Sequence, residues 1–124
     1  MAADLHPVVS IRLFREEKCF GSGIAQLLRG VELHHSLRAA AQSMGMAYSK
    51  AWRIIRTAEE VFGCKLLSST IGGQHGGGAV LTEEAVRLLT AYDDYCADLT
   101  AYSEARFEAA FGFYRELDKR QSGE

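Results

Sequence analysis

The side chains best suited to chemistry lie between residues 48 and 62. If this segment is a helix of about 3.6 residues per turn, its apolar side chains gather around Ile55 and the opposite arc is polar, with Glu60 as its one acid. Arginine and lysine bind phosphates or guanine edges, and hydroxyl groups can donate to either. The arc therefore predicts contact with DNA. Its basic and hydroxyl members are Ser49, Lys50, Arg53, Arg56 and Thr57.

Two other segments invite a different chemistry and support it less well. The glycine-rich segment 72–78 does not match the phosphate-binding loop GxxxxGK[ST], because no Lys-Ser or Lys-Thr follows it. We interpret it as a hairpin tip at which Gln74 and His75 contact the DNA backbone. His34 and His35 are adjacent in sequence, so their side chains point to different sides and make a poor metal pair.

The cysteines give no sign of catalysis. Cys64 lies beside Lys65, and a neighbouring cation can lower the pKa of a thiol, yet no catalytic partner is identifiable and we interpret Cys64 as a packing residue. The three cysteines are odd in number and show no CxxC spacing, which predicts free thiols in a reducing cytoplasm rather than disulfides or a zinc site. No Ser-His-Asp set or carboxylate pair can be argued. We expect a protein that is not an enzyme and that has no metal and no cofactor.

Two helices joined by a glycine turn are predicted to position the basic arc. The first begins after Ser36, whose hydroxyl can cap it, and stops at Gly45. Arg38 lies in its first turn, where we expect it to contact the DNA backbone. The second helix runs from residue 48 or 49 to 62 and stops at Gly63. An earlier helix, with Ser22 as a possible cap, has the apolar stripe Ile24, Leu27, Leu28 and Val31.

Short apolar runs predict the strands. Side chains that alternate in character over residues 8–14 predict one strand. We expect a loop after it, through residues 18–22. Residues 65–69 and 79–81 flank the glycine-rich segment and predict a β-hairpin. A helix-turn-helix followed directly by a hairpin is the winged form of that motif. The sequence thus predicts a mostly α fold with a small β wing.

A long helix is predicted from residue 83 to about residue 117, with Thr82 as its cap. Its apolar residues repeat about every 3.5 positions, which is typical of a helix that packs on another helix. At about 1.5 Å per residue the helix would be roughly 50 Å long, too long for a small domain to cover alone. We therefore expect a homodimer. The seam begins at Ala85, and the predicted interface residues are Leu88, Tyr92, Tyr95, Leu99 and Tyr102.

Composition limits the classes of protein to which the chain can belong. The chain has 124 residues, of which 48% are hydrophobic and 24% are charged, and this fits one ordinary globular domain. No apolar run reaches the ~18 residues of a membrane span, and no signal-peptide core is present. The net charge of −2 is unevenly distributed, with +3 over residues 29–82 and −5 over residues 83–124. The basic middle region agrees with the predicted DNA-binding arc.

Three runs together resemble a known family. They are SLRAAA at 36–41 with MGM at 44–46, YSKAW at 48–52, and the glycine-rich segment that ends in AVLT at 79–82. They resemble the N-terminal domain of the molybdate-responsive transcriptional regulators of the ModE type, whose wider kin are the LysR-type winged helices. The resemblance covers roughly residues 8–102. It implies a dimer whose second motif helix enters the major groove, and whose long helices join the two subunits.

Two features set the chain apart from the full-length regulators. Those regulators carry further C-terminal domains that bind molybdate, and this chain looks like a stand-alone member without them. They also often place a lysine near Gln74, where this chain has no fixed charge. A separately encoded sensor protein is therefore a possible partner.

The sequence leaves three functions open. The first is a cytoplasmic, homodimeric regulator of transcription that binds an inverted-repeat DNA site, with residues 1–82 as the winged domain and 83–124 as a dimerisation helix in the same structural unit. The second is a winged helix that has lost DNA binding and contacts another protein, which the net charge of −2 favours. The third is an oxyanion sensor with a pocket at the dimer seam.

Overall fold

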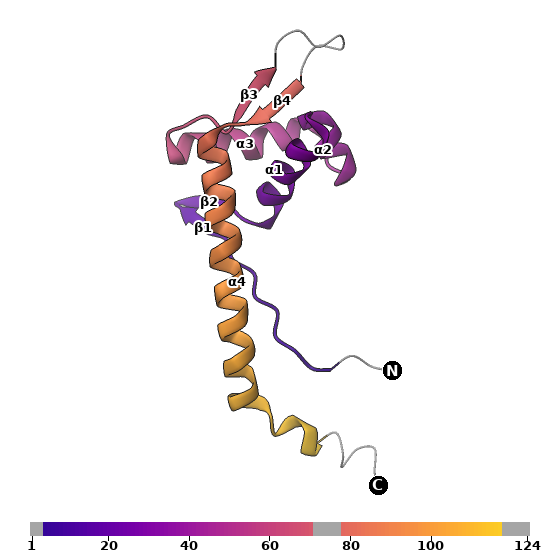
Figure 1. Ribbon diagram of the computed structural model, residues 1–124, viewed down its shortest axis with the longest axis vertical. Helices are drawn as coiled ribbons and strands as arrows, with labels where there is room; N and C mark the ends of the chain where they lie inside the picture. The colour runs from indigo at the N-terminus through magenta and orange to yellow at the C-terminus, as the bar shows by residue number, and fades with distance from the viewer. Residues whose placement is uncertain (1–3, 71–77, 118–124) are drawn as a thin grey trace. The chain divides into compact units, whose positions relative to one another are not determined.

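The computed structural model describes residues 4–70 and 78–117. Two compact units divide the chain: one is Ile11–Asp93, and the other joins Met1–Ser10 to Asp94–Glu124. The predicted winged helix-turn-helix, mostly α with a small hairpin, is confirmed (Figure 1). The elements in chain order are β1 (Leu13–Arg15), β2 (Glu17–Phe20), α1 (Ser22–His34), α2 (Leu37–Ser43), α3 (Tyr48–Phe62), β3 (Leu67–Thr70), β4 (Gly78–Leu81) and α4 (Glu83–Phe111).

The predicted strand over residues 8–14 and the loop after it were wrong in their bounds. The chain turns sharply at Glu16, which has a φ of 65°, and β1 pairs antiparallel with β2. This turn returns Cys19 and Phe20 to the core, so the residues expected in a loop form the second strand. The ring of Phe20 lies 5.2 Å from that of Tyr92. Burial of these side chains explains why the strands form here and not upstream.

Helix α1 buries the predicted stripe, and its cap differs from the prediction. Gly21 occupies the N-cap position and no side chain caps the helix, so Ser22 is the first helical residue instead of the cap. Gly30 lets α1 and α2 approach closely, because a Cβ built there would lie 2.7 Å from the Cβ of Ala40. The buried side chains of α1 are Ile24, Ala25, Leu27, Leu28 and Val31.

The caps and stops of the helix-turn-helix follow the sequence. The hydroxyl of Ser36 accepts a hydrogen bond from the Ala39 backbone nitrogen at 3.0 Å, which confirms the predicted cap. Gly45 and Gly63 have φ values of 65° and 70°, the left-handed conformation that favours glycine. Both glycines therefore end their helices as predicted, and α3 spans the predicted range.

The hairpin begins two residues later than predicted. The side chain of Glu59 accepts a hydrogen bond from the Leu66 backbone nitrogen at 2.9 Å, and Leu66 is fully buried. These contacts hold Lys65 and Leu66 against the end of α3, so β3 starts at Leu67, opposite Leu81. The backbone nitrogen of Ala79 also donates to the carbonyl of His35 at 2.9 Å. The hairpin is thus attached to α3 and to the α1–α2 connection.

Helix α4 starts at the predicted cap. The hydroxyl of Thr82 accepts from the Ala85 backbone nitrogen at 3.1 Å and donates to the Lys65 carbonyl at 2.7 Å. Within Ile11–Asp93 the buried side chains of α4 are Ala85, Leu89 and Tyr92. The buried face of α4 therefore includes Leu89, whereas Leu88, which was predicted to lie in the interface, is only half-buried.

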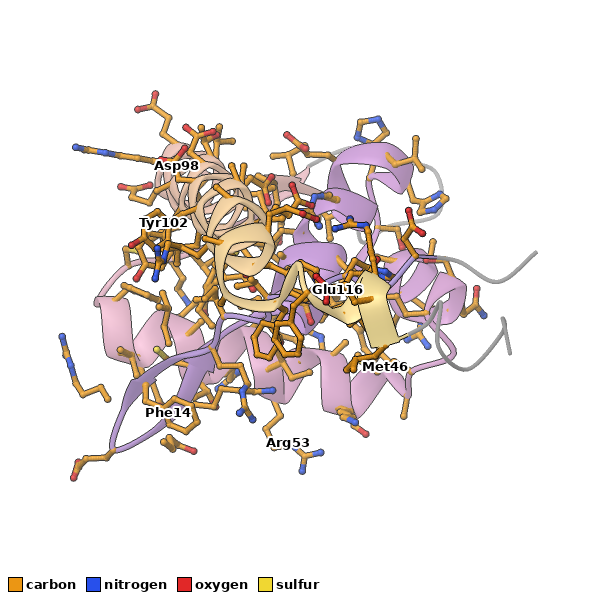
Figure 2. All side chains as sticks on the ribbon, turned by 90° about the horizontal axis from the view of Figure 1, so that it is seen from below. Phe14, Met46, Arg53, Asp98, Tyr102 and Glu116 are labelled. Atoms are coloured by element: carbon orange, nitrogen blue, oxygen red, sulfur yellow. The ribbon has the colours of Figure 1, made fainter. Side chains whose placement is uncertain are left out.

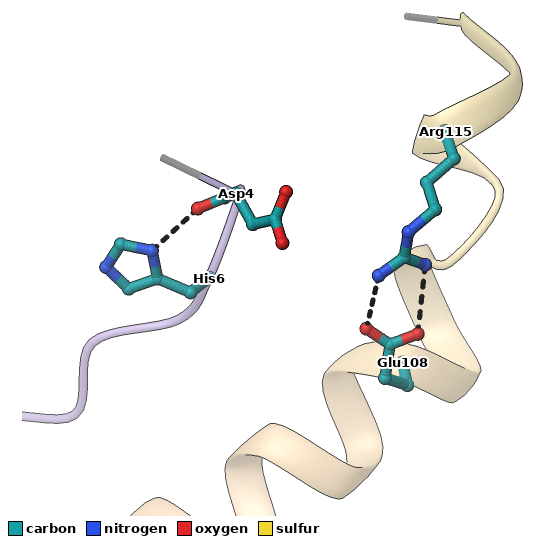
Figure 3. Close-up of polar contacts among 4 residues, drawn as sticks. All are labelled: Asp4, His6, Glu108 and Arg115. Carbon is teal, nitrogen blue, oxygen red and sulfur yellow. Dashed lines mark hydrogen bonds and ion pairs between the residues drawn. The ribbon is translucent and has the colours of Figure 1, made fainter. Parts of the chain in front are cut away.

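The end of α4 comes earlier than the predicted residue 117. The helix stops at Phe111, and a further helical turn follows over residues 114–117. Gly112 permits the break, since a Cβ there would lie 2.6 Å from the Glu108 carbonyl oxygen. Across the break, the guanidinium of Arg115 donates two hydrogen bonds to the Glu108 carboxylate, at 3.0 and 2.9 Å (Figure 3). These bonds hold the pKa of Glu108 below its ordinary value.

Candidate nucleic-acid interface

The outer face of α3 is the candidate site. Its inner stripe, Ala51, Ile55 and Ala58, is fully buried and fixes the rotation of the helix in its unit. Figure 2 shows the side chain of Arg53 projecting from α3 away from the body of the protein. Thr57 lies on the same face and is half-buried. Four of the five predicted arc residues are exposed, namely Ser49, Lys50, Arg53 and Arg56.

The charges of the outer face are not neutralised inside the described part of the chain. Lys50, Arg53 and Arg56 make no ion pair or side-chain hydrogen bond with any residue of 4–70 or 78–117. The acids of α3 lie at its C-terminal end, where Glu59 bonds to the backbone and Glu60 is exposed. The N-terminal half of the helix therefore presents cations and hydroxyls without an acid. This is the charge distribution that a polyanion requires.

The C-terminal end of α3 has mixed charge. An open hollow of about 390 Å³ is lined by Arg56, both glutamates and Cys64. Partial burial raises the pKa of the Cys64 thiol, and the carboxylates of Glu84 and Glu59 raise it further. The lowered pKa that Lys65 suggested is therefore wrong, because burial and the two carboxylates all disfavour the thiolate.

Arg38 joins the site from α2. It is exposed in the first turn, and its guanidinium carbon lies 4.2 Å from the ring centroid of Tyr48, the first residue of α3. The structure thus brings Arg38 to Tyr48 at the start of the basic face, and Ser49 and Lys50 follow Tyr48 in the chain. Gln74 and His75 lie outside the described residues.

Sequence analysis missed one cation beside the site. Lys18, on β2, lines a hollow of about 120 Å³ together with Arg53 and Thr57 of α3 and the start of α1. A strand prediction for residues 17–20 would have placed Lys18 on the opposite face from the buried Cys19, and so in solvent. The β1–β2 hairpin therefore adds a basic residue to the face that α3 presents.

The predicted interface residues of α4 divide between the two units. Tyr92 is 8% exposed, and its hydroxyl donates to the Ile11 carbonyl at 2.7 Å, so its side chain is occupied within its own subunit. In the other unit, Tyr95 is 52% exposed and Tyr102 is 66% exposed, with Leu99 half-buried between them. The surface that a second helix can cover is therefore this exposed half of the seam.

Two further observations limit the chemistry. No group of three or more His, Cys, Asp or Glu side chains in residues 4–70 and 78–117 is placed to hold a metal ion. His34 and His35 are exposed, at the end of α1 and in its left-handed C-cap. Among these same residues, no helix is long and apolar enough to cross a membrane.

Comparison with known sequences assigns the fold to a family. Residues 25–86, half of the chain, match the bacterial regulatory helix-turn-helix proteins of the lysR family. The chain belongs to this family. The matched range runs from α1 through the hairpin to the first turn of α4, so it contains the whole helix-turn-helix and the strands of the wing.

Individual proteins similar to this chain include ModE and MopB proteins. This lysR-family chain is 36% identical over 67 residues to the DNA-binding transcriptional dual regulator ModE of Escherichia coli K12, a match that covers 54% of the chain and 26% of that protein. It is 32% identical over 72 residues to the molybdenum-pterin-binding protein MopB of Rhodobacter capsulatus, covering 58% and 27%. The transcriptional regulator ModE of Haemophilus influenzae is 34% identical over 68 residues, covering 55% and 27%. The chain matches about a quarter of the length of these relatives. The predicted resemblance to ModE-type regulators is confirmed.

Proposed function

We propose that the protein regulates transcription by binding a specific double-stranded DNA sequence as a homodimer. The observation that carries the proposal is the outer face of α3, which exposes Lys50, Arg53 and Arg56 with no acidic partner in the described residues. Membership of a regulatory helix-turn-helix family supports it, as does similarity to a protein described as a DNA-binding regulator. The protein acts by binding, in the cytoplasm, and it catalyses no reaction.

In this proposal α3 enters the major groove. Lys50 and Arg53 donate to guanine or phosphate, and the hydroxyls of Ser49 and Thr57 donate to bases or backbone. Arg38 and Arg56 flank the helix and bind phosphates, which fix its position on the duplex without reading the sequence. Gln74 and His75 of the wing contact the backbone.

The homodimer forms through the exposed half of the α4 seam. Tyr95 and Tyr102 present large aromatic surfaces to solvent, with Leu99 between them, and a second copy of the same helix would bury all three. Two-fold symmetry then predicts an inverted-repeat site whose half-sites lie a whole number of helical turns apart. The acidic residues of α4 would face away from the DNA.

Whether this protein responds to molybdate is a question for experiment. One relative, MopB, is described as a molybdenum-pterin-binding protein, and another, ModE, as a DNA-binding regulator. The chain matches only about a quarter of the length of each. An oxyanion pocket at the dimer seam, or a separately encoded sensor bound to this protein, would connect DNA binding to a signal. Stabilisation against heat by molybdate or tungstate would reveal such a pocket, because a ligand that binds only the folded state raises its stability.

Selection from random DNA tests the proposal. The purified protein is mixed with a pool of random duplexes at about 100 mM salt and again at higher salt, where non-specific phosphate binding weakens. We expect an enriched inverted repeat that survives the higher salt. If a folded dimer enriches no sequence, with and without molybdate, the protein is better explained as a winged helix that contacts another protein.

A further inference from the structure

Four side chains form a continuous row of cations and rings across the helix-turn-helix. The guanidinium carbon of Arg38 lies 4.2 Å from the ring centroid of Tyr48, and that of Arg56 lies 6.0 Å from the ring centroid of Trp52. The two rings are neighbours in an edge-to-face contact, with centroids 6.3 Å apart and an angle of 79° between their planes. We name these four residues the arginine–aromatic ladder.

 An edge-to-face contact of this kind leaves the outer face of each ring available to a cation.

The arginines of the chain differ in what their guanidinium groups contact. Arg29 pairs with Asp93, and Arg15 donates to the Val61 carbonyl at 3.1 Å. For Arg38 and Arg56, in contrast, the described residues provide a ring and no hydrogen-bond acceptor. Their N–H groups are therefore available to a ligand.

Stacking and anion binding use different parts of a guanidinium group. An aromatic ring contacts the flat face of the guanidinium group, whereas a phosphate accepts hydrogen bonds from the N–H groups that lie in the guanidinium plane. Both contacts can therefore exist at once. A long arginine side chain that already rests on a ring also has less rotamer freedom to lose when a phosphate binds.

We propose that Tyr48 and Trp52 are positioning residues, which hold the guanidinium groups of Arg38 and Arg56 ready for DNA phosphates. This inference rests on the proposed function and deepens it. Because the ladder runs from α2 to α3, it would fix two phosphate contacts relative to the helix that reads the bases. The aromatic residues would then affect affinity without touching the DNA themselves.

A double-mutant cycle on one rung tests the inference. The variants are Tyr48→Leu, Arg38→Ala and the two combined, with Tyr48→Phe as the matched control that keeps the ring. Their affinities are measured for the duplex that the wild-type protein selects, over a range of salt concentrations. Thermal unfolding of each variant shows whether the fold is retained.

We expect Tyr48→Leu to weaken binding about two- to fivefold, the effect of one exposed cation–π contact, and Tyr48→Phe to bind like the wild type. The combined variant should bind no more weakly than Arg38→Ala alone. Arg38→Ala should reduce the salt slope by about one phosphate contact, while Tyr48→Leu leaves the slope unchanged. Trp52→Leu with Arg56→Ala should behave in the same way on the second rung.

Three results would overturn the inference. Additive effects of Tyr48→Leu and Arg38→Ala would mean that the ring acts independently of the arginine, and a wild-type affinity for Tyr48→Leu would mean that the ring does not matter. In both cases the wild-type protein still binds DNA, so the proposed function stands. If the wild-type protein binds no duplex, the proposed function and the inference fail together.

Discussion

Helices α3 and α4 use their exposed faces in opposite ways. α3 has a buried stripe inside its own unit, and the surface that it leaves exposed is polar and basic apart from the ring of Trp52. α4 buries its first turns, after which its exposed side chains include Tyr95, Tyr102 and Phe111. The apolar periodicity of a helix thus indicates that a face should be buried, and only the structure shows whether the same subunit buries it.

The largest expected effect concerns the basic face of α3. Replacing Lys50 and Arg53 together by alanine should weaken specific DNA binding by roughly a hundredfold, since each base-specific contact contributes about 1–3 kcal/mol. Affinity for the selected duplex, measured by fluorescence anisotropy, checks this. The charge-matched control removes two exposed cations of α4, Arg87→Ala with Arg106→Ala, and should bind almost normally. Equal losses in both variants would show that overall charge, and not the face of α3, determines binding.

The next effect concerns the exposed half of α4. Tyr102→Glu would place a carboxylate in the proposed interface, and an unpaired buried charge is costly, so the dimer should dissociate at least tenfold more readily. Ala97→Glu is the matched control, because Ala97 is exposed and lies on the side of the helix away from Tyr95 and Tyr102. Sedimentation over a range of concentrations measures both. A dimer that tolerates Tyr102→Glu must use another surface.

A smaller effect, on the free energy of unfolding, distinguishes the buried half of α4 from its exposed half. Tyr92→Phe removes the hydrogen bond to the Ile11 carbonyl, and it should lower the free energy of unfolding by about 0.5–1.5 kcal/mol. Tyr95→Phe removes a hydroxyl from an exposed ring and should leave that free energy nearly unchanged. Denaturant unfolding of the two variants tests the difference. Equal effects would mean that the two tyrosines have the same environment.

The smallest effect lies beyond the helix break at Gly112. Because Arg115 lowers the pKa of Glu108, the paired state is favoured above the ordinary glutamate pKa and is lost as the pH falls through the lowered value. An NMR titration should therefore find Glu108 titrating below its ordinary range, and Arg115→Gln should return it to that range. An unshifted Glu108 in the wild-type protein would show that the pair does not form in solution.

Local signals predicted most of the helix-turn-helix. Ser36 and Thr82 cap their helices, and Gly45 and Gly63 end theirs, because each effect depends on neighbouring residues in the chain. The outer arc of α3 followed from periodicity alone. These predictions needed no knowledge of tertiary structure.

The errors arose where distant residues decide the structure. The β1–β2 hairpin depends on the burial of Phe20 against Phe62 and Tyr92, and a sequence pattern does not show that cluster. The start of β3 depends on the bond from Leu66 to Glu59. The arginine–aromatic ladder depends on the packing of α2 against α3. The roles of the predicted DNA-binding and dimer residues remain predictions.

The position of Trp52 has a practical consequence. It is the only tryptophan of the chain, and it lies on α3 with 36% of its surface exposed, between the ring of Tyr48 and the guanidinium group of Arg56. Its fluorescence emission therefore originates from the proposed DNA-binding helix and from nowhere else in the protein. The molecule carries its own optical probe at the surface of interest, and ligand binding there can be followed without a label.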